Sequence, residues 1–268
     1  MPSPGMMAPR VMGILNVTPD SFSDGGRFLD PRAAIAHGED LIAAGAAILD
    51  IGGESTRPGA APVSEAEEID RVAPVIEGLR HAGAQISIDT MKPAVARAAM
   101  AAGASMWNDV AALREDGALQ AAATLNCEVV LMHMQGEPRT MQAAPHYDDV
   151  VAEVGAFLLQ RAHTAMAAGV ARERIWLDPG IGFGKSALHN LTLLRGLNAF
   201  VALGFPVLLG ASRKSFLKAI DAAAADPSQR LGGSLACALH AATAGVAAVR
   251  VHDVRETAQA LKLWEMLG

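Results

Sequence analysis

Short runs of consecutive apolar residues recur along the chain, and each is followed by a polar residue, a loop and an alanine-rich amphipathic stretch of helical length. These runs predict eight strands, at 11–15, 47–51, 85–88, 105–107, 129–132, 175–177, 207–209 and 247–251. The stretches between them predict helices, among them 32–44, 65–82, 93–102 and 149–168. We therefore expect a chain built from repeated strand and helix units.

Several predicted helices carry start and stop signals. Pro31 and Pro93 stand at first helical positions, and Ser64 precedes Glu67 at the spacing of a capping box. Many of the helices end on glycine, which accepts the left-handed conformation at a helix C-terminus. These glycines are Gly45, Gly83, Gly103, Gly169 and Gly245.

The apolar runs are continuous rather than alternating, which is typical of parallel strands covered by helices. Eight such units in 268 residues predict a single α/β domain, a (β/α)8 TIM barrel with its active site at the C-terminal ends of the strands. An open doubly wound sheet would give similar local patterns, but the count of eight favours the barrel. We expect an N-terminal extension at 1–10 and the barrel domain at 11–268.

Composition excludes several classes of protein. Hydrophobic residues make up 51% of the chain and charged residues 19%, so it can bury a sizeable core. A formal net charge of -6 without a basic run argues against nucleic-acid binding. No apolar stretch reaches the length of a membrane span, and the N-terminus lacks a signal-peptide core, so we expect a cytoplasmic protein. Cys127 and Cys237 stand alone and are expected to be small buried hydrophobes.

The predicted strands are followed by polar residues that a structural turn would not require. Each has a structural explanation when taken singly, because Asp and Asn form turns and caps and a histidine can be a satisfied core residue. A barrel brings them together at one mouth, where acids, amides and basic groups suit a polar planar ligand with a phosphate. They are Asn16, Asp50, Glu54, Asp89, Asn108, Asp109, His133, Asp178, Ser212, Arg213, Lys214, Arg250 and His252.

Two long loops, at 18–30 and 52–64, follow the first two strands and are rich in Gly, Pro, Ser, Thr and Asp. Loops in these positions carry function in barrels. The segment DPGIGFGK at 178–185 suggests a nucleotide loop, but Pro179 and Lys185 stand where the Walker and dinucleotide motifs need glycine. We interpret it as a flexible loop with Phe183 free to face a ligand, although its glycines could simply serve the turn.

Motifs spread over essentially the whole predicted barrel resemble those of the dihydropteroate synthase family. They are GILNVTPDSFSDGG at 13–26, DIGGESTRPG at 50–59, SIDT at 87–90, NDV at 108–110, MHM at 132–134, DPGIGFGK at 178–185, SRKS at 212–215 and RVHDV at 250–254. The first two are highly specific, whereas NDV alone would be weak. The resemblance implies a transferase that condenses para-aminobenzoate with hydroxymethyl-dihydropterin pyrophosphate to form dihydropteroate in folate synthesis, a reaction that sulfonamides target.

The resemblance also implies roles for individual residues. Pterin binding is implied for Asp89, Asn108, Met132, Asp178 and Lys214. Pyrophosphate binding is implied for Asn16, Thr56, Arg250 and His252, with Asn16 as the ligand of a Mg2+ cofactor. Binding of para-aminobenzoate is implied for Thr56, Arg57, Pro58, Gly182, Phe183, Ser212 and Lys214. Asp24, Arg57, Asp89 and Lys214 are implied to be catalytic, and the family is usually homodimeric.

The implied mechanism is dissociative: Asp89 would stabilise a pterin-methyl cation until the aniline nitrogen attacks, while the loops at 18–30 and 52–64 exclude water. Two alternatives stay open. A methyltetrahydrofolate methyltransferase would share the pterin-binding acids but would need no pyrophosphate clamp at Arg250 and His252. A catalytically silent paralogue would bind pterin pyrophosphate without condensing it, which only a turnover assay can decide.

Overall fold

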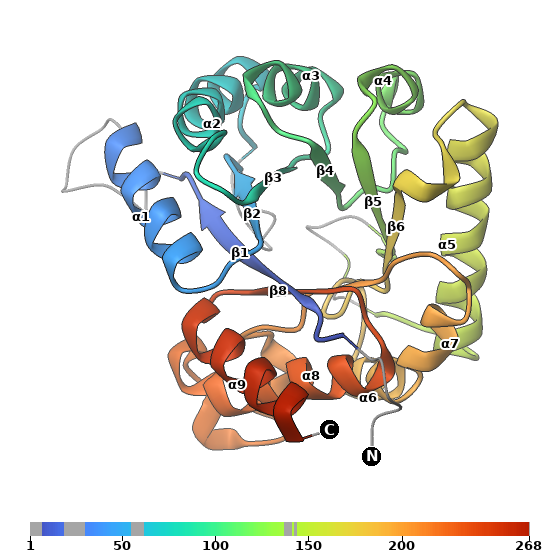
Figure 1. The fold of residues 1–268 in the computed structure, drawn as a ribbon. Helices are drawn as coiled ribbons and strands as arrows, with labels where there is room; N and C mark the ends of the chain where they lie inside the picture. The colour runs from blue at the N-terminus through green and yellow to red at the C-terminus, as the bar shows by residue number, and fades with distance from the viewer. Residues whose placement is uncertain (1–6, 19–29, 55–61, 137–140, 142–143, 268) are drawn as a thin grey trace.

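In the computed structural model, which describes residues 7–18, 30–54, 62–136, 141 and 144–267, eight parallel strands surround a central axis (Figure 1). The strands are β1 (Arg10–Asn16), β2 (Ile48–Gly52), β3 (Gln85–Asp89), β4 (Met106–Asp109), β5 (Glu128–Met132), β6 (Ile175–Asp178), β7 (Leu208–Leu209) and β8 (Ala248–Val251). Their order is β6-β5-β4-β3-β2-β1-β8-β7, and a parallel bridge between Leu177 and Val207 joins the two ends. The sheet closes into a barrel, which confirms the predicted fold class.

Helices pack around the outside of the strands (Figure 1). They are α1 (Pro31–Ala43), α2 (Glu65–Leu79), α3 (Pro93–Ala102), α4 (Ala118–Leu125), α5 (Val150–Ala167), α6 (Ala187–Arg195), α7 (Leu197–Val201), α8 (Leu231–Ala244) and α9 (Val254–Leu267). Short 3-10 helices are η1 (Arg172–Arg174), η2 (Ser215–Ala219), η3 (Ala222–Ala224) and η4 (Pro227–Arg230). The bounds of α3 are those predicted, whereas α2 ends at Leu79 with Arg80 as its C-cap, before the predicted end at residue 82.

The structure contains capping interactions at several of the predicted helix ends. The Asp30 side chain accepts a hydrogen bond from the backbone N of Arg32 at 2.9 Å, and Ser64 accepts one from the backbone N of Glu67 at 3.2 Å. Four of the five predicted glycines, Gly45, Gly103, Gly169 and Gly245, stand at or next to the C-cap of their helix with a positive φ, as at Gly103 with +122°. Gly83 also has a positive φ, but it lies beyond the C-cap of α2, Arg80, so it does not end that helix. Local sequence therefore determines where these helices begin and end.

Side chains that alternate along the strands fill the barrel interior in layers. At the amino-terminal end Arg10 donates to Gln85 at 2.7 Å, and Gln85 donates to Glu128 at 2.5 Å, which links β1, β3 and β5. The next layer is apolar and consists of Met12, Ile48, Met106, Val130, Trp176, Leu208 and Ala248. The interior is therefore solid, and polar groups gather at the carboxyl ends of the strands.

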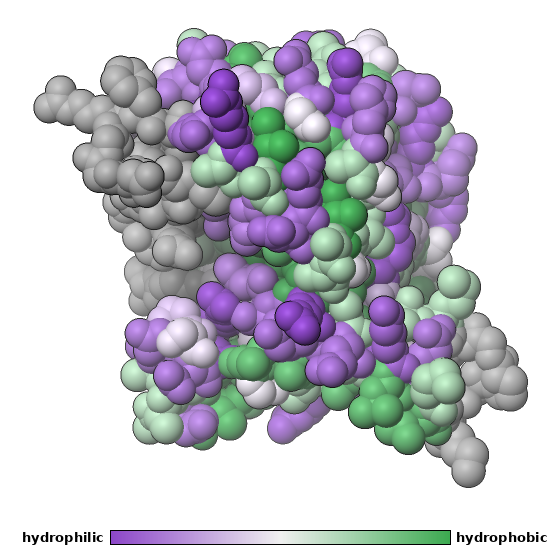
Figure 2. Space-filling model, turned by 60° about the vertical axis from the view of Figure 1, so that its left-hand side comes forward, coloured by the Kyte–Doolittle hydropathy of each residue, from purple (hydrophilic) through white to green (hydrophobic). Residues whose placement is uncertain are grey.

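A second and larger apolar core lies between the sheet and the helices. Cys127 and Cys237 are buried as free thiols, and burial raises the pKa of each to about 11, which confirms them as inert packing residues. On the outside, hydrophilic residues cover much of the surface, with groups of hydrophobic residues between them (Figure 2). Within the described residues, no helix is both long and apolar enough to cross a membrane.

Candidate active site

The carboxyl ends of β2, β3, β4 and β8 bring four polar side chains into contact. Arg250 donates through Nε to Asp50 Oδ2 at 2.5 Å and through Nη2 to Asp89 Oδ2 at 2.7 Å. Asn108 Nδ2 donates to the same Asp50 Oδ2 at 3.0 Å. The predicted meeting of polar strand ends is confirmed for these residues. Asp50, to which the family resemblance gave no role, lies at their centre.

Asp89 occupies an unusual electrostatic environment. Burial raises the pKa of its carboxyl to about 7, with Asp50 and Glu68 also raising it and Arg250 and Lys214 opposing the rise. The Oδ1 atoms of Asp89 and Asp50 are buried and have no hydrogen-bond partner among the described residues. Because buried acceptors are normally paired, these oxygens are suited to receive donors from a ligand.

Lys214, after β7, lies against the loop that follows β6. Its Nζ is 4.0 Å from the centroid of the Phe183 ring, a cation–π distance, and a Cβ added at Gly182 would lie 3.0 Å from its Cδ. Burial lowers the pKa of Lys214 to about 8, and the neighbouring Arg250 lowers it further while Asp178 raises it. Lys214, Phe183 and Gly182, predicted to bind para-aminobenzoate, are therefore brought together.

The loop that follows β6 is held from within by Lys185, a residue to which the sequence assigned no role. Its buried Nζ lies 2.9 Å from the backbone oxygens of Gly180 and Phe183 and 2.9 Å from Nδ1 of His133. Burial, with Lys185 nearby, lowers the pKa of His133 to about 3, so its ring is neutral. The loop is more tightly held than the flexible one we expected, and its glycines serve the turn itself.

Asp178, at the end of β6, is also tied to this loop. Its Oδ1 accepts a hydrogen bond from the backbone N of Gly180 at 2.7 Å, and burial raises the pKa of its carboxyl. The second carboxylate oxygen approaches the position that a Cβ on Gly210 would occupy, at 3.9 Å. Asp178 therefore lies at the barrel mouth on the side of β7, and its pterin role stays a prediction.

We expect Gly180→Ala to lower the free energy of unfolding by more than about 2 kcal/mol, because the new Cβ would lie 1.9 Å from the His133 backbone oxygen and φ is +68°. The matched control is Gly155→Ala in α5, where nothing lies within 4 Å of the added Cβ and a helical alanine should stabilise by about 0.5–1 kcal/mol. Denaturant unfolding of both variants measures the difference. Equal stabilities would show that the loop tolerates a side chain.

The three polar residues that follow β7, Ser212, Arg213 and Lys214, make different contacts. Ser212 Oγ lies 3.1 Å from His252 Nδ1 and accepts the backbone N–H of His252 at 3.2 Å. Arg213 adopts a left-handed φ of +56°, donates through its backbone N to Ser234 Oγ at 2.9 Å and through Nε to Asp253 Oδ2 at 3.0 Å. Arg213 is thus committed to an ion pair with Asp253, while Ser212 and His252 meet at the mouth.

Asn16 and Met132 also stand at strand ends. Asn16 closes β1 with a half-buried side chain, beside Gly52 in the register with β2. Met132 is buried in a cluster with Val110, Met134 and Met141, against which Phe183 and Met91 pack. This cluster gives the mouth an apolar wall beside the Phe183 ring.

Two strand-end acids have structural roles instead. Asp109 is fully buried and accepts hydrogen bonds from the backbone N–H groups of Ala111 and Leu113, both at 2.7 Å. Glu54 accepts a hydrogen bond from Lys92 Nζ at 2.8 Å. For these two, the structural explanation of a polar strand end holds.

The remaining predicted residues, Asp24, Thr56, Arg57 and Pro58, lie outside the described residues, as does much of the two long loops. Their implied roles stay predictions.

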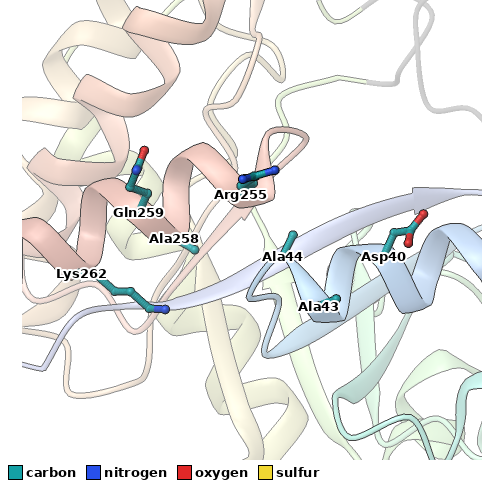
Figure 3. A pocket seen from close by; sticks show the side chains of 7 residues that line it. All are labelled: Asp40, Ala43, Ala44, Arg255, Ala258, Gln259 and Lys262. Atoms are coloured by element: carbon teal, nitrogen blue, oxygen red, sulfur yellow. The ribbon is translucent and has the colours of Figure 1, made fainter.

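A separate pocket lies outside the barrel, between α1 and α9 (Figure 3). It is lined by Asp40, Ala43, Ala44, Arg255, Ala258, Gln259 and Lys262. Its polar side chains all belong to exposed residues, and none of the residues that meet at the barrel mouth lines it. We therefore assign the candidate active site to the mouth.

Comparison with known proteins adds independent findings. A family model described as pterin binding enzyme matches residues 12–252. The dihydropteroate synthase of Escherichia coli is 51% identical over 258 residues, 96% of this chain and 91% of that protein. A structure of the Xanthomonas albilineans enzyme in complex with 7,8-dihydropteroate has a TM-score of 0.87 at 50% identity, covering 97% of this chain and 94% of that one. The Yersinia pestis enzyme with a sulfonamide drug has a TM-score of 0.91 at 48% identity, with coverage of 97% and 94%.

Proposed function

Because this chain belongs to the family of pterin-binding enzymes, we infer that it condenses para-aminobenzoate with hydroxymethyl-dihydropterin pyrophosphate, forming dihydropteroate for folate synthesis and releasing pyrophosphate. One observation carries this inference: described strand-end residues of the motifs that resemble dihydropteroate synthases meet at one mouth, where Asp89, Asn108 and Arg250 join through Asp50 in a single polar cluster. The test is pyrophosphate release by the purified protein, measured with and without para-aminobenzoate. Release that depends on para-aminobenzoate, together with dihydropteroate as product, is the expected result.

We assign recognition of the pterin to Asp89, Asn108, Asp178 and Lys214. A pterin edge presents several ring donors and acceptors, which carboxylate, amide and ammonium groups can match at fixed positions. The Oδ1 of Asp89 is buried and has no hydrogen-bond partner in the part of the chain that the structure describes, which supports this assignment, because a ligand N–H would satisfy it. Met132 would face the ring from the apolar wall of the mouth.

We assign the pyrophosphate to Arg250 and His252. The guanidinium of Arg250 has five N–H donors, and the contacts to Asp50 and Asp89 leave further donors for phosphate oxygens. His252 lies on the same strand end, beside Ser212. A cationic group beside the leaving oxygens would favour their departure, because it offsets the negative charge that develops on them.

The reaction then follows from these positions. The bond between the pterin methylene carbon and the pyrophosphate oxygen breaks, and both of its electrons leave with pyrophosphate. The carboxylate of Asp89 stabilises the cationic carbon electrostatically. The aniline nitrogen, with its ring near Phe183 and Lys214, attacks with its lone pair and then loses a proton.

A Mg2+ ion bound with the pyrophosphate fits the donor set at the mouth. Among the described residues, no group of three or more His, Cys, Asp or Glu side chains is arranged to hold a metal. Mg2+ commonly takes one or two protein oxygens and completes its shell with substrate phosphates and water, so the strand-end amide oxygen of Asn16 suits this role. When bound, the ion would neutralise charge on the leaving group.

We expect Asn16→Ala to weaken the binding of pterin pyrophosphate about tenfold, and to leave the binding of a pterin without pyrophosphate nearly unchanged. The reason is that only the phosphate-bearing ligand brings the metal against the amide. Calorimetry with both ligands in the presence of Mg2+ measures the two affinities. Full activity in excess chelator would remove the metal from the mechanism.

The two alternative functions are separated by the same assays. A methyltransferase would turn over methyltetrahydrofolate and release no pyrophosphate, and a silent paralogue would bind pterin pyrophosphate without product. Sequence identity to dihydropteroate synthases over nearly the whole chain, together with the cluster around Arg250, favours the condensing enzyme. Homodimer formation and cytoplasmic residence stay predictions, tested by sedimentation of the purified protein and by cell fractionation.

A further inference from the structure

Asp50 has no role in the reaction as assigned above, yet its carboxylate lies at the centre of the polar cluster. The residue is fully buried on β2. One of its oxygens, Oδ2, accepts hydrogen bonds from Arg250 Nε at 2.5 Å and from Asn108 Nδ2 at 3.0 Å. It therefore joins the group assigned to the pterin with the group assigned to the pyrophosphate.

We propose that Asp50 is a positioning residue, which sets the orientation of the Asn108 amide and of the Arg250 guanidinium for the pterin pyrophosphate. The proposal rests on the proposed function. It goes beyond that function because Asp50 is not among the groups assigned to substrate: it acts through two residues that are.

The hydrogen bond to Asp50 determines which way the Asn108 amide faces. An ionised carboxylate accepts hydrogen bonds and has none to donate, so Asn108 must turn its NH2 group toward Asp50. The amide oxygen is then the atom that Asn108 can offer to a ligand. A ligand must therefore bring an N–H donor to this position, and a ring with an acceptor in the same place is rejected.

Two carboxylates hold the guanidinium of Arg250 in one orientation. Its guanidinium is planar, and it is held at Nε by Asp50 and at Nη2 by Asp89. Two carboxylates on neighbouring strands thus fix the plane and leave the other N–H groups pointing in set directions. Without Asp50 the guanidinium would lose its contact at Nε and could rotate about the contact between Nη2 and Asp89.

The first test is Asp50→Asn, which keeps the shape of the side chain and removes its charge. An amide at position 50 can turn either its oxygen or its NH2 group toward Asn108, so the orientation of Asn108 is no longer specified. We expect the affinity for a pterin without pyrophosphate to fall about tenfold or more. We expect KM for pterin pyrophosphate to rise by a similar factor and KM for para-aminobenzoate to change less than about twofold.

The matched control is Glu128→Gln. Glu128 is also an acid on the barrel interior that accepts a hydrogen bond from a side-chain amide, but it lies at the opposite end of the barrel. Its replacement should leave both KM values within about twofold of wild type. A rise in KM for both variants would show a general effect of interior acids on the fold.

A double-mutant cycle with Asn108→Ala isolates the route of the effect. If Asp50 acts through Asn108, Asp50→Asn should change the affinity for the bare pterin much less in the Asn108→Ala background than in wild type. Inorganic pyrophosphate with Mg2+ is the second probe. Asp50→Asn should lower the affinity of the protein for pyrophosphate, because Arg250 loses the carboxylate that orients its guanidinium. Full additivity in the cycle would overturn the route through Asn108.

The pH dependence of kcat/KM gives a further test. If Asp50 only supported the fold, its replacement would not shift the acid limb of this profile. Asp89 is faced by Arg250, Lys214, Asp50 and Glu68, and the negative charge of Asp50 helps to raise its pKa. Removing that charge should move the acid limb of kcat/KM to lower pH, while Glu128→Gln leaves it in place. An unmoved limb would count against Asp50 as a neighbour of the working carboxylate.

These experiments distinguish a failure of the positioning role of Asp50 from a failure of the proposed enzymatic activity. If wild-type protein forms dihydropteroate and Asp50→Asn binds the bare pterin as tightly as wild type, the positioning role is wrong. If wild-type protein forms no dihydropteroate, the proposed function fails, and the calorimetry with bare pterin still tests Asp50. Should Asp50→Asn not fold, Asp50→Ser, which also removes the charge, takes its place with the same expected loss.

Discussion

Replacing Lys214 with alanine should lower the affinity for pterin pyrophosphate about 10- to 100-fold and leave the unfolding temperature close to that of wild type. A charge-assisted hydrogen bond contributes about 1.5–3 kcal/mol, which corresponds to this range. The fold should survive, because burial and Arg250 already disfavour the charged form of Lys214 and lower its pKa to about 8. Calorimetry and thermal unfolding of the same preparation measure the two effects.

Lys214→Met is the matched variant, because it keeps an apolar stem against the Phe183 ring and removes the charge. If charge is what binds the pterin, Lys214→Met should lose as much pterin affinity as Lys214→Ala. Unchanged affinity together with a melted protein would instead identify Lys214 as a structural residue.

Asp89→Asn should lower kcat about 100- to 1000-fold, the effect typical of removing one electrostatic stabiliser of a transition state. The same carboxyl should produce a pH dependence. Its pKa is raised to about 7, so the carboxylate forms only as the pH rises through that value, and kcat/KM should rise with it. Lys214, with a pKa lowered to about 8, should lose its charge above that value, so the full profile should be bell-shaped.

Asp109→Asn is the control for the acid limb. Asp109 is also buried, and burial raises its pKa to about 7, but its oxygens accept hydrogen bonds from the backbone N–H groups of Ala111 and Leu113. The acid limb should persist in Asp109→Asn and disappear in Asp89→Asn. A limb that survives in Asp89→Asn would assign the titration to another group.

The fold could be predicted from the sequence because its signals are local. An apolar run, a polar strand end and a glycine after each helix are all read within a few residues, as at 93–102, where prediction and helix coincide. Strand ends and motifs also predict site residues, and the structure places Asp89, Asn108 and Arg250 among them in one cluster at the barrel mouth. The contacts between them follow from closure of the barrel, which no local pattern describes.

Asp50 shows most clearly which contacts sequence patterns cannot predict. Its two partners lie 58 and 200 residues away in the chain, so its central position emerges only when β2, β4 and β8 are placed around one axis. Lys185 is similar, because its contact to His133 spans 52 residues. Arg213 was grouped with its basic neighbours, and only the contact to Asp253 separates it from them.

The solid interior of the barrel limits the route by which ligands reach and leave the site. The link from Arg10 through Gln85 to Glu128, and the apolar layer above it, leave the carboxyl-end mouth as the way in and out within the described residues. On the proposed assignments the pterin contacts at Asn108 and Asp178 are almost fully buried, whereas Phe183 and Lys214 are partly exposed. On these assignments we expect the pterin pyrophosphate to bind before para-aminobenzoate, and we expect a molecule bound beside Phe183 to slow the release of a pterin bound deeper in the mouth.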